Sequence, residues 1–111
     1  MLIYKVFRAA EWADMQRLGE TPGAPVDLAD GYVHISTAEQ LAGTLAKHFA
    51  DEDDLTLLAC EADALGDDLR WEPSRGGALF PHLYRNLRME DVVWTRPITL
   101  RDGVHVTGIE P

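Results

Sequence analysis

The sequence has little cysteine, few basic residues and no long apolar run, and each shortage excludes a class of protein. Its single cysteine, Cys60, cannot form a disulfide within the chain, and four scattered histidines give no ligand spacing for structural zinc. Ten Lys and Arg residues stand against nineteen Asp and Glu residues, a net charge of −9 that argues against a general nucleic-acid-binding protein. Without an apolar run of membrane-spanning length, a membrane protein is not expected either.

Common catalytic motifs are missing as well. The chain has no P-loop, no glycine-rich dinucleotide motif after a strand and no nucleophile elbow. Residues 1–9 lack the apolar region and cleavage site of a signal peptide, so we expect a cytoplasmic protein. Arginines nevertheless gather in the third quarter of this acidic chain, which leaves open a local site for a small phosphorylated ligand. They are Arg70, Arg75, Arg85 and Arg88.

What is present is a pattern of short helices and strands in a chain of ordinary globular composition, 46% hydrophobic and 26% charged. The apolar spacing predicts helices at 9–18 and 38–50, an exposed loop at 20–29, and strands at 2–7, 55–60, 69–73, 92–100 and 104–109. We therefore predict a single α+β domain over residues 1–111. It should have a compact mixed or antiparallel sheet and two main helices.

The chain is organised around residues 30–40, DGYVHISTAEQ, which predict a turn, a short strand and a helix start. Alternation along the strand puts three polar side chains on one face, opposite an apolar face that can be buried. These are Tyr32, His34 and Ser36. Thr37 and Gln40 have the spacing of a capping box. A helix N-terminus directly after a strand suits an anionic or strongly polar ligand.

A second unusual stretch is residues 71–84, WEPSRGGALFPHLY. Alternation places Glu72 on the opposite face from Trp71, and His82 and Tyr84 could share a face unless a turn through Pro81 breaks the pattern. Between these polar residues, two adjacent glycines permit a close approach of the backbone to a ligand. Polar residues of the types found at functional sites interrupt two otherwise apolar regions. This favours a pocket, provided that the two stretches meet.

These stretches carry a specific resemblance. The beginning Ile3-Tyr4-Lys5, the segment DGYVHIST and the segment WEPSRGGALFPHLY resemble the uncharacterised bacterial family numbered 952 among the domains of unknown function. The resemblance covers nearly the whole chain. That family is similar in turn to the ADP-ribosyltransferase-like superfamily, which includes the RNA 2′-phosphotransferases, and the implied fold is a compact split sheet with a cleft for NAD or an ADP-ribosylated intermediate.

The resemblance also implies site residues. His34-Ile35-Ser36 matches a His-x-Ser pattern in the NAD-binding cleft of the phosphotransferases, so His34 would contact the nicotinamide-side ribose. Glu72 would stabilise the positive charge that develops on the ribose, and Arg75 would grip a diphosphate. The candidate catalytic residues are His34, Glu72 and His82. The candidate cofactor-binding residues are Tyr32, Ser36, Thr37, Arg75, Gly76, Gly77 and Tyr84.

Three functions remain open at this point. The first is a transferase-like enzyme that uses NAD or ADP-ribose as cofactor or substrate. The second is a non-catalytic module that binds a nucleotide or another small ligand. The third is a hydrolase or isomerase of a small polar substrate, with His34 and His82 as acid and base and no need for NAD.

Overall fold

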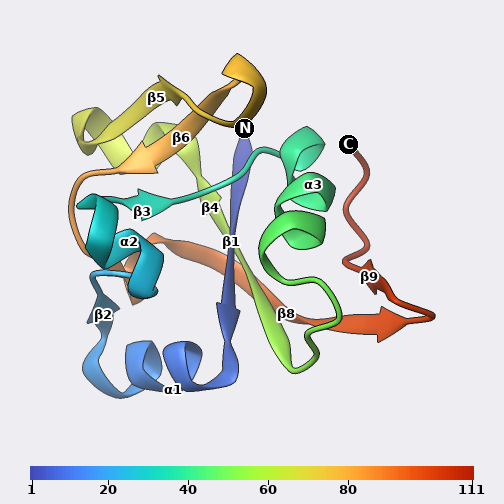
Figure 1. Ribbon diagram of the computed structural model, residues 1–111. Helices are drawn as coiled ribbons and strands as arrows, with labels where there is room; N and C mark the ends of the chain where they lie inside the picture. The colour runs from blue at the N-terminus through green and yellow to red at the C-terminus, as the bar shows by residue number, and fades with distance from the viewer.

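The computed structural model describes all 111 residues except the side chain of Arg75. Its helices and strands form three small antiparallel sheets, with strand orders β1-β4-β8-β9, β2-β7 and β3-β6-β5 (Figure 1). In chain order the elements are β1 (Leu2–Arg8), α1 (Ala9–Leu18), β2 (Glu20–Thr21), α2 (Pro25–Asp30), β3 (Val33–His34), α3 (Ala38–His48), β4 (Leu55–Glu61), the 3₁₀ segment η1 (Ala62–Asp68), β5 (Leu69–Pro73), η2 (Arg75–Gly77), β6 (Leu79–Leu83), β7 (Leu87–Arg88), η3 (Met89–Asp91), β8 (Val92–Arg101) and β9 (Val104–Val106).

The largest sheet is built on β4, which lies between β1 and β8. Side chains of β1 alternate between two apolar clusters, one on each face of this sheet. Helix α1 covers one face through Met15, and α3 covers the other through Leu41, Leu45 and Phe49. These three side chains are all buried, as expected for the apolar face of an amphipathic helix and the residue that follows it.

The first predicted helix is confirmed. Helix α1 spans Ala9–Leu18 as expected, and Gly19 ends it in a left-handed conformation with φ of 82°. Asp102 and Gly103 form the turn between β8 and β9, both with positive φ. In Figure 1 this hairpin projects away from the rest of the molecule. The last strand is shorter than predicted, since β9 ends at Val106.

The exposed loop predicted at 20–29 is wrong. Residues Glu20–Thr21 form β2 and Pro25–Asp30 form α2, so a short third α-helix is present beside the two predicted main helices. Pro25 occupies the first helical position, where its missing N–H has no cost, and Asp27 accepts a hydrogen bond from the backbone N of Ala24 at 2.7 Å. Proline and glycine are common in loops, but in this segment they mark a helix start and the turn that precedes it.

The three-stranded sheet positions the polar residues. Its register pairs His34 of β3 with His82 of β6, and His82 with Arg70 of β5. Directly paired residues share one face of an antiparallel sheet, as do residues two apart, so Glu72 joins them. Pro81 does not break this pattern, because it lies within β6 opposite Trp71. No helix of the described chain is long and apolar enough to cross a membrane.

Candidate functional site

A cleft of about 460 Å³ opens between β1, the α2–β3 segment, α3 and the β5–β6 hairpin. It is of the size that small-molecule sites usually have. Phe49 and Phe80 contribute apolar walls, and His34, Ser36 and His82 contribute polar ones. The two stretches singled out in the sequence therefore meet at one cleft.

His34 is held between two carboxylates. Its Nδ1 atom lies 2.6 Å from Oδ1 of Asp27, and its Nε2 atom lies 2.9 Å from Oδ2 of Asp30. The backbone N of His34 donates to the same Oδ1 atom of Asp27 at 3.0 Å. Both ring nitrogens of His34 therefore have a carboxylate oxygen as their partner.

Asp27 is itself fixed by a buried lysine. Its Oδ2 atom accepts a hydrogen bond from Lys5 Nζ at 2.7 Å, and Lys5 also donates to the carbonyl oxygen of His34 at 2.9 Å. Burial by itself raises the pKa of Asp27, but the hydrogen bonds from His34 and Lys5 and the Lys5 charge outweigh it, and the pKa is lowered. Burial lowers the pKa of Lys5 despite the attraction of Asp27. Lys5 and Asp27 together hold the backbone and the ring of His34 in place.

His82 has a separate carboxylate partner. Its Nδ1 atom lies 2.9 Å from Oε1 of Glu72, and the hydroxyl of Tyr84 donates to the same oxygen at 2.6 Å. The hydrogen bonds from Tyr84 and His82 lower the pKa of Glu72, while the bond to Glu72 raises the pKa of Tyr84. His82 is buried, with 3% of its surface exposed, so Glu72 fixes the orientation of its ring.

Tyr32 joins the two histidines. Its ring stacks on His82 with a centroid distance of 4.1 Å and lies 4.6 Å from the centroid of His34. Burial raises the pKa of Tyr32, and the charges of Asp30, Glu72 and Asp27 raise it further, so its hydroxyl stays protonated at neutral pH. The guanidinium carbon of Arg70 lies over the ring of Tyr84, 4.6 Å from the ring centroid. The result is a packed cluster of aromatic rings.

The predicted site residues therefore divide into two groups. Tyr32, His34, Glu72, His82 and Tyr84 are in contact with one another. Of these five, the histidines line the cleft, whereas Tyr32 and Tyr84 line a second hollow of about 210 Å³, and Glu72 lies behind His82.

The remaining candidates lie apart from that cluster. Ser36 lines the cleft, and its hydroxyl lies 2.8 Å from that of Thr44 on α3. Thr37 caps α3 through the predicted capping box with Gln40. Gly76 and Gly77 form the exposed β5–β6 turn with positive φ and are not among the described residues that line the cleft. The side chain of Arg75 lies outside the described part of the structure.

Sequence reasoning missed Lys5, Asp27 and Asp30. A signal for the first existed, because a lysine in an apolar strand is almost never fully buried unless it is paired. A signal for Asp27 lay in Pro25, which marks the first turn of a helix and so places Asp27 near a helix N-terminus. The pairing of Lys5 with Asp27 depends on tertiary contacts that neither segment specifies alone.

Metal and thiol chemistry gain no support from the described residues. Among them, no group of three or more His, Cys, Asp or Glu side chains is placed to hold a metal ion. Cys60 is fully buried, and burial raises the pKa of its thiol to about 12, so it is not activated as a nucleophile. The side chains that line the cleft include two imidazoles with carboxylate partners, those of His34 and His82.

The fold and the site thus define a small α+β protein with a polar cleft that contains two carboxylate-held histidines. The family model described as Protein of unknown function (DUF952) matches residues 6–95, and the chain belongs to this family. No curated protein matches the chain. The link to the ADP-ribosyltransferase-like superfamily stays an expectation, which these comparisons do not address.

Solved structures of a Caulobacter crescentus protein, CC0527, are similar over almost the full length. Its crystal structure has 49% sequence identity and a TM-score of 0.93, and the alignment covers 97% of this chain and 96% of that one. A doubly substituted variant of CC0527 gives 47% identity, the same TM-score and the same coverage of 97% and 96%. The solution structure gives 50% identity and a TM-score of 0.83, over 93% of this chain and 90% of that one.

Proposed function

We propose that this protein is an enzyme that acts on a small polar substrate, with His34 and His82 as the acid–base pair of the cleft. The observation that carries the proposal is the pairing of these residues: they are direct cross-strand partners, and each ring contacts a different carboxylate. Imidazoles whose orientation is set by a carboxylate are the commonest devices for proton transfer near neutral pH.

The two histidines have different surroundings and so different roles. Glu72 occupies Nδ1 of His82, which leaves Nε2 as the atom that accepts a proton from the substrate. His34, whose two ring nitrogens face Asp27 and Asp30, is assigned the role of proton donor. Asp27 and Glu72 act through the histidines and are positioning residues.

The test begins with the substrate, which must be found by screening. The purified protein is incubated with mixed metabolites, and consumption of any compound is followed by mass spectrometry. We expect a pH–rate profile with a limb near neutrality and a loss of about 10²–10⁴-fold in kcat for His82→Asn. His105→Asn is the matched control, because His105 contacts the carbonyl oxygen of Glu52 and does not line the cleft. Equal turnover in wild type, His34→Asn and His82→Asn would overturn the proposal.

A second candidate is the use of NAD or ADP-ribose in the same cleft. Its specific support is that His34 and Ser36, the residues of the His-x-Ser pattern, both line the cleft. The test is a titration with NAD, ADP-ribose and a 2′-phosphorylated oligoribonucleotide, followed by NMR of the histidine rings. Shifts at His34 and His82, absent at His105, would support it. Binding that is unchanged in a folded His34→Ala variant would reject it, and binding without turnover would indicate a non-catalytic module.

A further inference from the structure

The contact between Asp30 and His34 differs from the other carboxylate contacts of the site. Asp27, the other carboxylate on His34, is fully buried and tied to Lys5 and to backbone N–H groups. The side chain of Asp30 is 46% exposed, at the last residue of α2, and lines the cleft. An exposed carboxylate at a helix end is easily displaced, because water and salt screen its ion pair.

The charges around the cleft are otherwise cationic. Lys5, Arg8 and Lys47 line it, and Asp30 supplies the only carboxylate among the lining side chains that the structure describes. Lys5 is already neutralised by Asp27, and Arg8 is neutralised by Glu52 at 2.7 Å. Lys47 has no partner among the described residues and sits in the last turn of α3.

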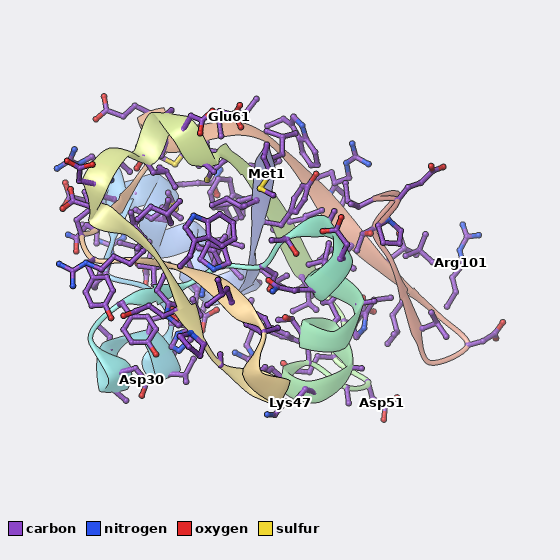
Figure 2. All side chains as sticks on the ribbon, turned by 90° about the horizontal axis from the view of Figure 1, so that it is seen from above. Met1, Asp30, Lys47, Asp51, Glu61 and Arg101 are labelled. Carbon is purple, nitrogen blue, oxygen red and sulfur yellow. The ribbon has the colours of Figure 1, made fainter. Side chains whose placement is uncertain are left out.

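Asp30 and Lys47 lie on the same side of the molecule. Figure 2 shows both along one edge in the view from above, Asp30 on α2 and Lys47 on α3. Both also line the same cleft. A ligand that enters from this side therefore meets a carboxylate on one wall and an ammonium group on the other.

We propose that an oxyanion of the substrate, a phosphate or a carboxylate, binds at Nε2 of His34 in the place of the Asp30 carboxylate and also contacts Lys47. This assignment rests on the proposed function, and it names the chemical class of the substrate. Asp30 then acts as an internal competitor. It satisfies His34 while the cleft is empty and swings into solvent when the anion arrives.

The exchange leaves the number of anionic partners of His34 unchanged. His34 keeps one carboxylate, Asp27, on Nδ1 and replaces the other with the ligand, so both ring nitrogens keep an anionic partner throughout. Lys47 has a flexible side chain that reaches a ligand without a change in the backbone. The aromatic wall of Phe49 and Phe80 is left for the apolar part of the same ligand.

The test measures the affinity for inorganic phosphate, and in a parallel series for acetate, by NMR of the histidine ring nitrogens. Asp30→Asn should bind phosphate about three- to fivefold more tightly than wild type, because one negative charge close to the ligand is removed. Lys47→Met should weaken binding by a similar factor. Asp14→Asn is the matched control, since Asp14 is an exposed carboxylate in an ion pair with Arg17 and does not line the cleft.

Each outcome supports or overturns the assignment of an oxyanion site at His34. Tighter binding in Asp30→Asn, with shifts at His34 and none at His105, supports the assignment, and the stronger of the two anions identifies the substrate as a phosphate or a carboxylate. Unchanged or weaker binding in Asp30→Asn, or no binding of either anion to any variant, overturns it. A neutral substrate turned over with dependence on His82 would remove the oxyanion and leave the proposed function intact. Anion binding without any dependence of turnover on His82 would support the oxyanion site and overturn the proposed function.

Discussion

His34 and His82 are direct register partners on β3 and β6, and their ring centroids lie 5.4 Å apart. Each ring has its Nδ1 atom on a different carboxylate, Asp27 for one and Glu72 for the other. The two carboxylates come from different elements, α2 and β5, so the pair exists only when the whole hairpin and the α2 segment are assembled.

The buried pair of Lys5 and Asp27 should be energetically coupled. Lys5→Met leaves the Asp27 carboxylate without its cation, and we expect a loss of about 3–5 kcal/mol in the free energy of unfolding. The measurement is urea unfolding of Lys5→Met, Asp27→Asn and the double variant. The double variant should lose less than the two single losses combined, by about 0.5–3 kcal/mol. Additive losses would show that the two groups do not stabilise one another.

The contribution of Asp91 to stability should depend on pH. Its carboxylate accepts two hydrogen bonds from Arg85, at 2.8 and 3.1 Å, and one from the backbone N of Arg88 at 2.8 Å. Burial raises the pKa of Asp91, but Arg85 and the Arg88 backbone outweigh it and lower the pKa below the ordinary value of 3.8. A carboxyl group with a lowered pKa in the folded state stabilises it above the unfolded pKa, and this stability is lost as pH falls through the folded pKa.

We therefore compare wild type with Asp91→Asn in urea at several pH values. The difference should be about 1.5–3 kcal/mol at neutral pH, the usual size for hydrogen bonds to a charged group. It should shrink as the pH falls below about 4. Asp14→Asn, an exposed pair with Arg17, should show almost no difference at any pH. A difference that stays constant down to low pH would contradict the assignment.

Glu72 should control the ionisation of Tyr84. The hydrogen bond from Tyr84 to Glu72 raises the pKa of the phenol, because Glu72 stabilises the protonated form. Glu72→Gln should lower the pKa of Tyr84 toward its ordinary value. The ultraviolet absorbance of tyrosinate measures this titration, and the difference between each protein and its Tyr84→Phe counterpart isolates the single tyrosine. Identical curves for wild type and Glu72→Gln would argue against the contact.

The capping box at the start of α3 should contribute to stability in the ordinary way. Thr37 accepts a hydrogen bond from the backbone N of Gln40, and the side-chain oxygen of Gln40 accepts one from the backbone N of Thr37. Thr37→Ala should cost about 1 kcal/mol. Thermal unfolding measures the loss, and Thr37→Ser, which keeps the hydroxyl, should restore most of it. A loss of equal size in the serine variant would assign the effect to packing of the methyl group.

Local patterns in the sequence determined most of the elements around the site. Alternation predicted that Val33 and Ile35 are buried and that His34 faces the other way, and the structure confirms both, because a strand leaves no other choice once one face is covered. The capping box of Thr37 and Gln40 is confirmed as well, because both residues lie within one helical turn. These signals act over a few residues and need no tertiary partner.

Tertiary structure alone decided which polar residues meet. Nothing in the local sequence links Lys5 to Asp27 or His34 to His82, because these pairs form only when β1, α2, β3 and β6 pack together. The prediction of a loop at 20–29 is wrong for a related reason. A helix of six residues is not stable by itself, so α2 forms only because packing and the contacts of Asp27 hold it. The sequence by itself therefore determined the elements and the residue types of the site. Burial of a charged pair and register across strands, which depend on distant segments, decided how those residues face one another.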